Sequence, residues 1–196
     1  MYQFIRDYGW IFFVVLGVIG TGLVLYFLIK EFKTKLSKED KQHLDSITDK
    51  FRSIVKLNGG ALYEGFSIGD KKNKIQYLIL SRGGLCSIEV NFIEGKLLGD
   101  KDSEKWQIVD KKQEIENPLK NNQSKSSALS NLVGNDIAIS DYVLFVKADL
   151  VMVSAPNALN EDRLINKLEQ LAKSQKYSPE LVNKVNRKLQ ELKYKK

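Results

Sequence analysis

The chemistry that this sequence could perform centres on three polar side chains that interrupt two apolar stretches of β-strand character. Gln76 lies in residues 75–80, and Glu89 and Asn91 lie in residues 85–93. Polar groups on an otherwise apolar sheet face need hydrogen-bond partners or a function. A carboxylate flanked by two carboxamides offers oxygen ligands but only one negative charge, so we expect a weak cage for Mg²⁺.

A tight turn between the two stretches would bring the three residues together. Gly83 and Gly84 can take the positive φ angles that such a turn needs. With these glycines as the turn, Gln76 lies directly opposite Asn91 and diagonal to Glu89, and all three side chains share one sheet face. The alternative to a functional site is a structural cluster, in which Glu89 is hydrogen-bonded to the two carboxamides.

These residues belong to a longer pattern along the chain. It consists of residues 75–81, Gly83 or Gly84, residues 88–91, Gly95, Trp106, Asn117, Pro118 and residues 142–145. Over roughly residues 40–155, the pattern resembles the nuclease-related domain (NERD) family, which is similar to the restriction-endonuclease-like superfamily with its PD-(D/E)xK signature. The resemblance implies an α/β fold, with a restriction-endonuclease-like mixed sheet flanked by helices.

The resemblance also implies a chemistry. In the family, an Asp on the first strand and a Glu on the second hold Mg²⁺, and a Lys two residues further on orients or activates the attacking water. These three positions fall on Gln76, Glu89 and Asn91, so only the Glu is retained. An amide oxygen is a poor substitute for a carboxylate at a hard cation, and Asn91 has no ammonium to stabilise developing charge. The family's Gln after its Asn-Pro pair falls on Asn121, a further difference.

We therefore expect a catalytically inactive nuclease-fold module, with Gln76, Glu89 and Asn91 at degenerate catalytic positions and no cofactor. The alternative is an active Mg²⁺-dependent nuclease, in which Glu89 binds the metal and another residue restores the missing groups. The candidates for that role are Gln123, Lys125, Asp45, Asp49 and Glu64.

Hydrophobic spacing and turn residues predict the elements that position this region. Helices are expected at residues 37–57 and 119–133, from Asn160 onward, and from Ser178 onward. Strands are expected at residues 61–68, 75–80, 85–93, 95–98, 106–109, 142–146 and 150–153. The last helix has a basic side opposite its apolar stripe; we expect it to pack on its own domain, with a partner or anionic lipid as alternatives.

An uncharged stretch precedes the domain. Residues 8–29 contain 22 residues without a charge, enough for a helix of about 33 Å that crosses a bilayer once. Lys30, Lys33 and Lys35 follow it, whereas Arg6 alone precedes it, so the C-terminal part should lie in the cytoplasm, at the cell membrane. We expect an anchor with its basic flank at residues 1–35, a NERD-like domain at 36–175 and a basic amphipathic helix at 176–196.

Composition narrows the remaining functions. Cys86 is the only cysteine and His43 the only histidine, which excludes internal disulfides and cysteine- or histidine-clustered zinc sites. The chain has 31 basic and 24 acidic residues, and the excess lies at its two ends. The basic ends could bind anionic lipid or nucleic acid, whereas the neutral middle favours a protein partner in a membrane assembly.

Overall fold

The structure is a computed structural model that describes residues 36–68 and 74–194. The chain divides into two compact units, residues 1–45 and 46–196, and the sheet lies in the second. Within the described residues, no helix is both long and apolar enough to cross a bilayer. The anchor expected at residues 8–29 lies outside the described part of the chain.

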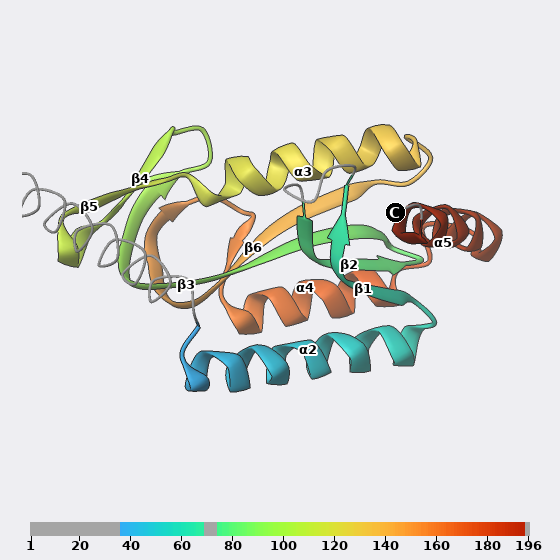
Figure 1. The fold of residues 1–196 in the computed structure, drawn as a ribbon, viewed down its shortest axis with the longest axis horizontal. Helices are drawn as coiled ribbons and strands as arrows, with labels where there is room; N and C mark the ends of the chain where they lie inside the picture. The colour runs from blue at the N-terminus through green and yellow to red at the C-terminus, as the bar shows by residue number, and fades with distance from the viewer. Residues whose placement is uncertain (1–35, 69–73, 195–196) are drawn as a thin grey trace, which may run out of the picture. The chain divides into compact units, whose positions relative to one another are not determined.

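The described elements begin with a helix, continue with five strands, and end with helices on either side of a further pair of strands (Figure 1). The helices are α2 (Lys38–Asn58), α3 (Pro118–Val133), α4 (Glu161–Lys173) and α5 (Pro179–Tyr194), with a short 3-10 helix, η1, at Val109–Lys111. The strands are β1 (Ala61–Ser67), β2 (Lys74–Ser81), β3 (Gly84–Asp100), β4 (Lys105–Ile108), β5 (Gln113–Glu116), β6 (Ile139–Ser154) and β7 (Ala158–Leu159).

These strands form one mixed sheet of seven strands. β1 to β5 pair antiparallel in sequence order, whereas β6 runs parallel to β3 and to β7. This confirms the predicted α/β class with a mixed sheet and four helices. The likeness to the restriction-endonuclease fold in particular stays a prediction.

The long strand β3 connects two halves of the sheet. Along one edge it pairs with β6 from Leu85 to Asp100. Its other edge pairs with β2 from Gly84 to Ile88, and with β4 only at Leu97 and Leu98. Residues 89–96 of β3 therefore have no strand partner on that edge. We call the part on the β2 side of this gap the proximal half and the part on the β4 side the distal half.

Helices cover both faces of the proximal half. On one face, Leu78 and Leu80 pack with Leu129 of α3 and with Val185 and Leu189 of α5. On the other face, Phe51 of α2 contacts Tyr77 edge to face, with ring centroids 5.3 Å apart, and α4 packs against β6. Because both faces are covered, the proximal strands are buried almost continuously (Figure 1).

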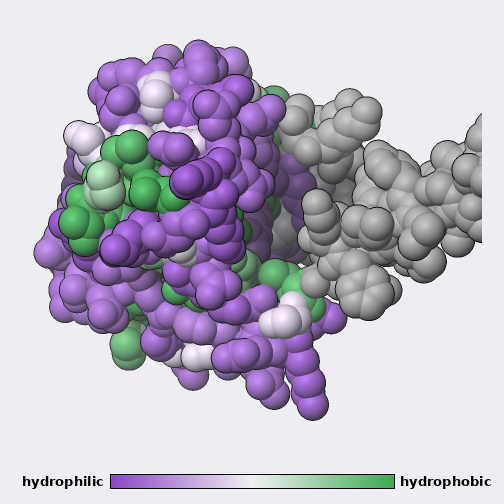
Figure 2. Space-filling model, turned by 90° about the vertical axis from the view of Figure 1, so that its left-hand side faces the viewer, coloured by the Kyte–Doolittle hydropathy of each residue, from purple (hydrophilic) through white to green (hydrophobic). Residues whose placement is uncertain are grey.

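One face of the distal half packs on a smaller core. Trp106 and Phe145 stack at its centre with ring centroids 5.7 Å apart, as expected of core residues. None of the described helices covers the opposite face, and Leu98, Val151 and Met152 are exposed there. Figure 2, which views the molecule from the β4 and β5 side, shows apolar side chains gathered among polar ones. We call this set of exposed side chains the apolar patch.

Most predicted elements are confirmed, with three differences. β3 and β6 are each continuous, although the sequence suggested a break in both; β-bulges at these points interrupt the apolar pattern but not the strand. β5 and β7 were not predicted, because Gln113–Glu116 is mostly polar and Ala158–Leu159 is too short to show alternation. The first hairpin has a different turn, which changes the pairing at the candidate site.

Candidate functional site

The expected pairing of Gln76 with Asn91 is wrong by two residues. Arg82 and Gly83 form the turn, and Ser81 pairs with Gly84 rather than with Cys86. Gly83 occupies the turn because a Cβ there would lie 2.0 Å from the carbonyl oxygen of Leu171. Since side chains alternate with a period of two, this shift leaves the face of every residue unchanged and places Gln76 beside Glu89.

Gln76 supplies a hydrogen-bond acceptor to the backbone of β3 at the point where β2 and β3 separate. The ladder between β2 and β3 ends at the pair Tyr77 and Ile88, so the next N–H of β3 on that edge has no partner among the described strands. The Gln76 Oε1 atom accepts a hydrogen bond of 2.9 Å from the N–H of Val90. The side-chain amide thus takes the place of a strand carbonyl at a half-buried position.

Two more side-chain oxygens accept hydrogen bonds from backbone N–H groups along the unpaired stretch of β3. Asn91 Oδ1 accepts from the N–H of Ile93 at 2.9 Å, within the first β-bulge. Asp110 Oδ2 accepts from the N–H of Lys96 at 2.8 Å. Two of the three predicted site residues, Gln76 and Asn91, therefore direct their oxygens at backbone N–H groups.

Glu89 has a different partner. Its Oε1 atom lies 2.6 Å from Nζ of Lys125, and the two side chains are only 22% and 11% exposed, respectively. Lys125 lies on α3, and Ser126, one residue further on, is buried against the sheet. The sequence named Lys125 as one group that could reach the site, and this contact is confirmed. Gln123, the other candidate on α3, is exposed.

Asn122 was not predicted as a site residue, yet it fixes α3 to the sheet. It is fully buried, accepts from Ser87 Oγ at 2.8 Å, and donates through Nδ2 to the carbonyl oxygen of Tyr142 at 2.8 Å. It falls in the buried stripe of α3 between Leu119 and Leu129. A polar residue in an apolar helical stripe was the signal that could have identified it.

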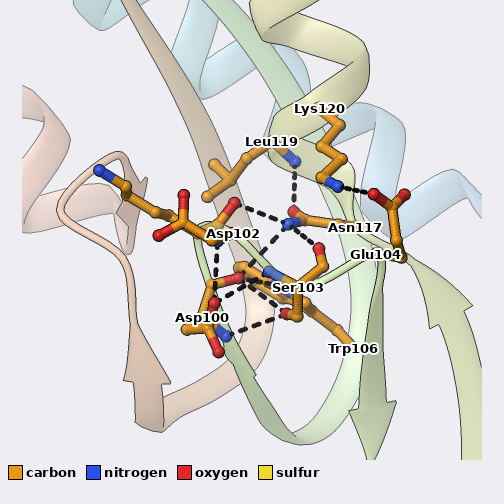
Figure 3. Close-up of polar contacts among 9 residues, drawn as sticks. Asp100, Asp102, Ser103, Glu104, Trp106, Asn117, Leu119 and Lys120 are labelled. Carbon is orange, nitrogen blue, oxygen red and sulfur yellow. Dashed lines mark hydrogen bonds and ion pairs between the residues drawn. The ribbon is translucent and has the colours of Figure 1, made fainter.

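Asn117 holds the start of α3 against the β3–β4 loop (Figure 3). Its Oδ1 atom accepts from the N–H of Leu119, which is an N-cap. Its Nδ2 atom lies 2.8–3.3 Å from the carbonyl oxygens of Asp100, Lys101 and Ser103. The predicted helix start at Asn-Pro is thus confirmed, and the Asn has a second, structural role.

A pocket of about 690 Å³ opens between the gap in β3 and the start of α3. Its charged lining residues are Glu89, Glu104, Glu116, Lys105 and Lys120. Lys120 pairs with Glu104, and Lys105 pairs with Glu114 outside the pocket. Asn121 also lines the pocket. Because three acidic and two basic residues line the pocket, it does not attract phosphate strongly.

The donor set fits Mg²⁺ poorly. Gln76 and Asn91 each direct their oxygen at a backbone N–H, and Glu89 is neutralised by Lys125. Two of the acids that could have joined Glu89 are held elsewhere, since Arg52 pairs with both Asp49 and Glu64. In the described part of the chain, no group of three or more acidic, His or Cys side chains could hold a metal ion.

Comparisons with known proteins identify a family. The model of the nuclease-related domain matches residues 40–146, which is more than half of the chain. The match spans α2, the hairpin of β2 and β3, α3 and the first part of β6. No curated protein and no solved structure matches significantly.

Proposed function

The chain belongs to the nuclease-related domain family, and from this premise we propose that it is a binding module that has lost phosphodiester hydrolysis. One observation carries the proposal: one oxygen of each of Gln76, Glu89 and Asn91 is engaged by another group of the chain, and the only carboxylate of the three is paired with an ammonium. The ammonium of Lys125 neutralises the charge of Glu89, and the two neutral amide oxygens supply no further charge to hold a divalent cation.

Metal binding and cleavage are the direct test. We expect calorimetric titration of the purified chain with Mg²⁺ or Mn²⁺ to give no saturable heat, and DNA and RNA to stay intact with either metal. Glu89→Gln, which removes the one carboxylate with little change in shape, should behave identically in both assays. Metal binding or cleavage in the wild type that disappears in Glu89→Gln would overturn the proposal.

A protein segment is the ligand that the pocket beside Glu89 suits best. Nucleic acid needs a surplus of basic groups, whereas this lining holds three carboxylates and two ammonium groups. Apolar contacts from Val90, Ile93 and Pro118 add surface that a peptide side chain could cover. Retention on nucleic acid that weakens steeply with salt, and that is lost when the Lys-rich tail is removed, would instead favour nucleic-acid binding.

A second candidate function is metal-dependent nuclease activity, and one contact favours it. Lys125 brings an ammonium within 2.6 Å of Glu89, near the strand where Asn91 replaces the family's Lys. In that case Lys125→Met should abolish cleavage while leaving the fold intact. Under the proposed binding function, the same variant changes no nuclease signal because none exists.

We also propose that the module acts at the cytoplasmic face of the cell membrane, anchored through residues 8–29. The supporting feature is the uncharged stretch with its following lysines. The full chain should sediment with membranes and resist carbonate extraction, and a chain lacking residues 1–35 should not. Protease added outside intact cells should leave the C-terminal domain uncut; digestion of that domain would reverse the proposed orientation.

A further inference from the structure

The Asn-Gly pair at the end of α2 is a chemical feature that the proposed function leaves unexplained. Of all the asparagines in the sequence, only Asn58 is followed by glycine. The side-chain amide of an asparagine can react with the backbone nitrogen of the next residue. A glycine in that position leaves its nitrogen open to approach, because it has no Cβ. The pair is therefore a candidate for modification by the chain itself.

The surroundings of Gly59 are open. Gly59 is exposed, its φ angle is +67°, and a Cβ built there would meet no atom within 4 Å. Leu57, on the other side of Asn58, is 83% exposed. The carbonyl oxygen of Val55 accepts from the N–H of Gly60 at 3.0 Å, as in the Schellman motif that ends many helices. The helix end thus sets the conformation of Gly59, and its surroundings leave it room to move.

A hydrogen bond restrains the side chain of Asn58 in the folded protein. Its Nδ2 atom donates to the carbonyl oxygen of Ile54, one helical turn back, at 2.7 Å. This restraint acts at the last turn of α2, and the ends of helices fray more readily than their middles. We therefore expect the amide to react in the native chain, but more slowly than in an unfolded one.

We propose that Asn58 is a site of spontaneous deamidation. The backbone nitrogen of Gly59 loses its proton and attacks Cγ of Asn58, which closes a succinimide ring. The side-chain nitrogen leaves as ammonia and takes up that proton. Water then opens the ring. Cleavage of the bond from Cγ to nitrogen gives aspartate, and cleavage of the bond from the backbone carbonyl carbon to nitrogen gives isoaspartate. The proposal is independent of whether the chain binds metal, protein or nucleic acid.

Either product changes the end of α2. Its carboxylate has no donor for the carbonyl oxygen of Ile54, and it places a negative charge at the negative end of the helix dipole. Isoaspartate also lengthens the main chain by one carbon atom. Gly60 has little room to shift, because a Cβ there would lie 2.4 Å from the carbonyl oxygen of Leu80. The extra atom therefore displaces the last turn of α2 rather than the start of β1.

Mass spectrometry of the full chain tests the proposal. Trypsin cleaves after Lys56 and Lys71, and the peptide between these cuts contains Asn58 as its only asparagine. During incubation of the native protein at mildly alkaline pH, this peptide should show the mass gain of deamidation and separate into aspartate and isoaspartate forms. Asn135, which is exposed but followed by aspartate, is the internal control, and it should convert more slowly by about tenfold or more.

Gly59→Ala is the matched variant, because alanine adds only the Cβ that hinders attack. Alanine is also strained at a positive φ, so this variant and the wild type are compared in urea, where the fold has no influence. There the variant should convert about tenfold more slowly, and the wild type should convert faster than in buffer. Absence of conversion at Asn58 in the native protein would overturn the proposal. Equal rates at Asn58 and Asn135, or an unchanged rate in Gly59→Ala, would also overturn it.

Discussion

In the proximal half of the sheet, helices cover both faces, whereas in the distal half one face stays open to solvent. β3 itself shows the difference. It is fully buried from Gly84 to Ile88, whereas from Glu94 onward only Leu97 is buried. The two ends of β3 thus lie in different environments. The candidate site lies at the boundary between them, at residues 89–96 of β3, which pair with neither β2 nor β4.

This boundary explains why polar residues occur where the sequence suggested a catalytic site. An unpaired strand edge near the core exposes N–H groups that must find acceptors. Gln76, Asn91 and Asp110 supply those acceptors. In this chain, side-chain oxygens thus satisfy the unpaired edge of β3, and this observation supports the proposed binding function.

The largest effect is expected when a leucine is replaced by alanine in each half of the sheet. The pair of variants tests the contrast in burial between the halves. Leu80 of the proximal half is fully buried, and Leu98 of the distal half is 40% exposed. Leu80→Ala should lower the free energy of unfolding by about 2–5 kcal/mol, because it leaves a cavity among packed side chains. Leu98→Ala should lower that of the monomer by less than about 1 kcal/mol. Urea denaturation followed by tryptophan fluorescence measures both.

Similar losses for the two leucine variants would mean that the distal face is packed as tightly as the proximal core. That outcome would contradict the division of the sheet proposed above.

A smaller effect is expected at Asn117, which joins α3 to the distal β3–β4 loop. Asn117→Asp keeps the oxygen that caps the helix but replaces the Nδ2 donor that three carbonyl oxygens share. The free energy of unfolding should fall by about 3 kcal/mol, since a buried carboxylate then faces unpaired carbonyls. Thermal denaturation measures the loss.

Asn121→Asp is the control for that variant, because Asn121 is an exposed asparagine of the same helix. It should change stability by no more than about 0.5 kcal/mol. If the two aspartate variants lose equal stability, the contacts of Asn117 Nδ2 do not stabilise the loop, and the helix cap alone accounts for this residue.

Gln76 provides the next test, at the boundary itself. Gln76→Ala should lower the free energy of unfolding by about 1–2 kcal/mol, because the N–H of Val90 loses its acceptor at a half-buried site. Hydrogen exchange at the Val90 amide should accelerate, and Gln76→Glu, which keeps an acceptor of the same length, should restore its protection. Unchanged exchange in Gln76→Ala would show that the hydrogen bond does not close the strand edge.

The proximal half was the more predictable part from sequence. Mainly apolar runs at residues 75–80 and 85–93, separated by glycines, specified the hairpin and the faces of its side chains. The exact register was not specified, because Arg82-Gly83 and Gly83-Gly84 are both acceptable turns and only the carbonyl of Leu171, distant in sequence, decides between them. The predicted register was wrong by two residues. Gln76 therefore lies beside Glu89 rather than opposite Asn91, but its side chain is on the predicted face of the sheet.

The distal half and the site contacts could be predicted less well. β5 consists mostly of polar residues, and its pairing depends on β4 rather than on its own pattern. The ion pair of Glu89 with Lys125 joins residues 36 positions apart, and only the packing of α3 brings them together. The hydrogen bonds of Gln76 and Asn91 to backbone N–H groups depend on a gap in strand pairing that no local pattern reports.

The smallest expected effect concerns the exposed ion pair at the edge of the distal half. The hydrogen bond and charge of Lys105, 2.7 Å away, lower the pKa of Glu114 below its ordinary value. A lowered folded-state pKa contributes stability above the unfolded pKa, and this contribution is lost as the pH falls through the folded pKa. Lys105→Ala should raise the pKa of Glu114 toward its ordinary value in an NMR titration, whereas Lys101→Ala should leave it unchanged. Because both groups are exposed, the shift in the wild type should also shrink at high salt. A shift that persists in molar salt would indicate that this edge is shielded from solvent.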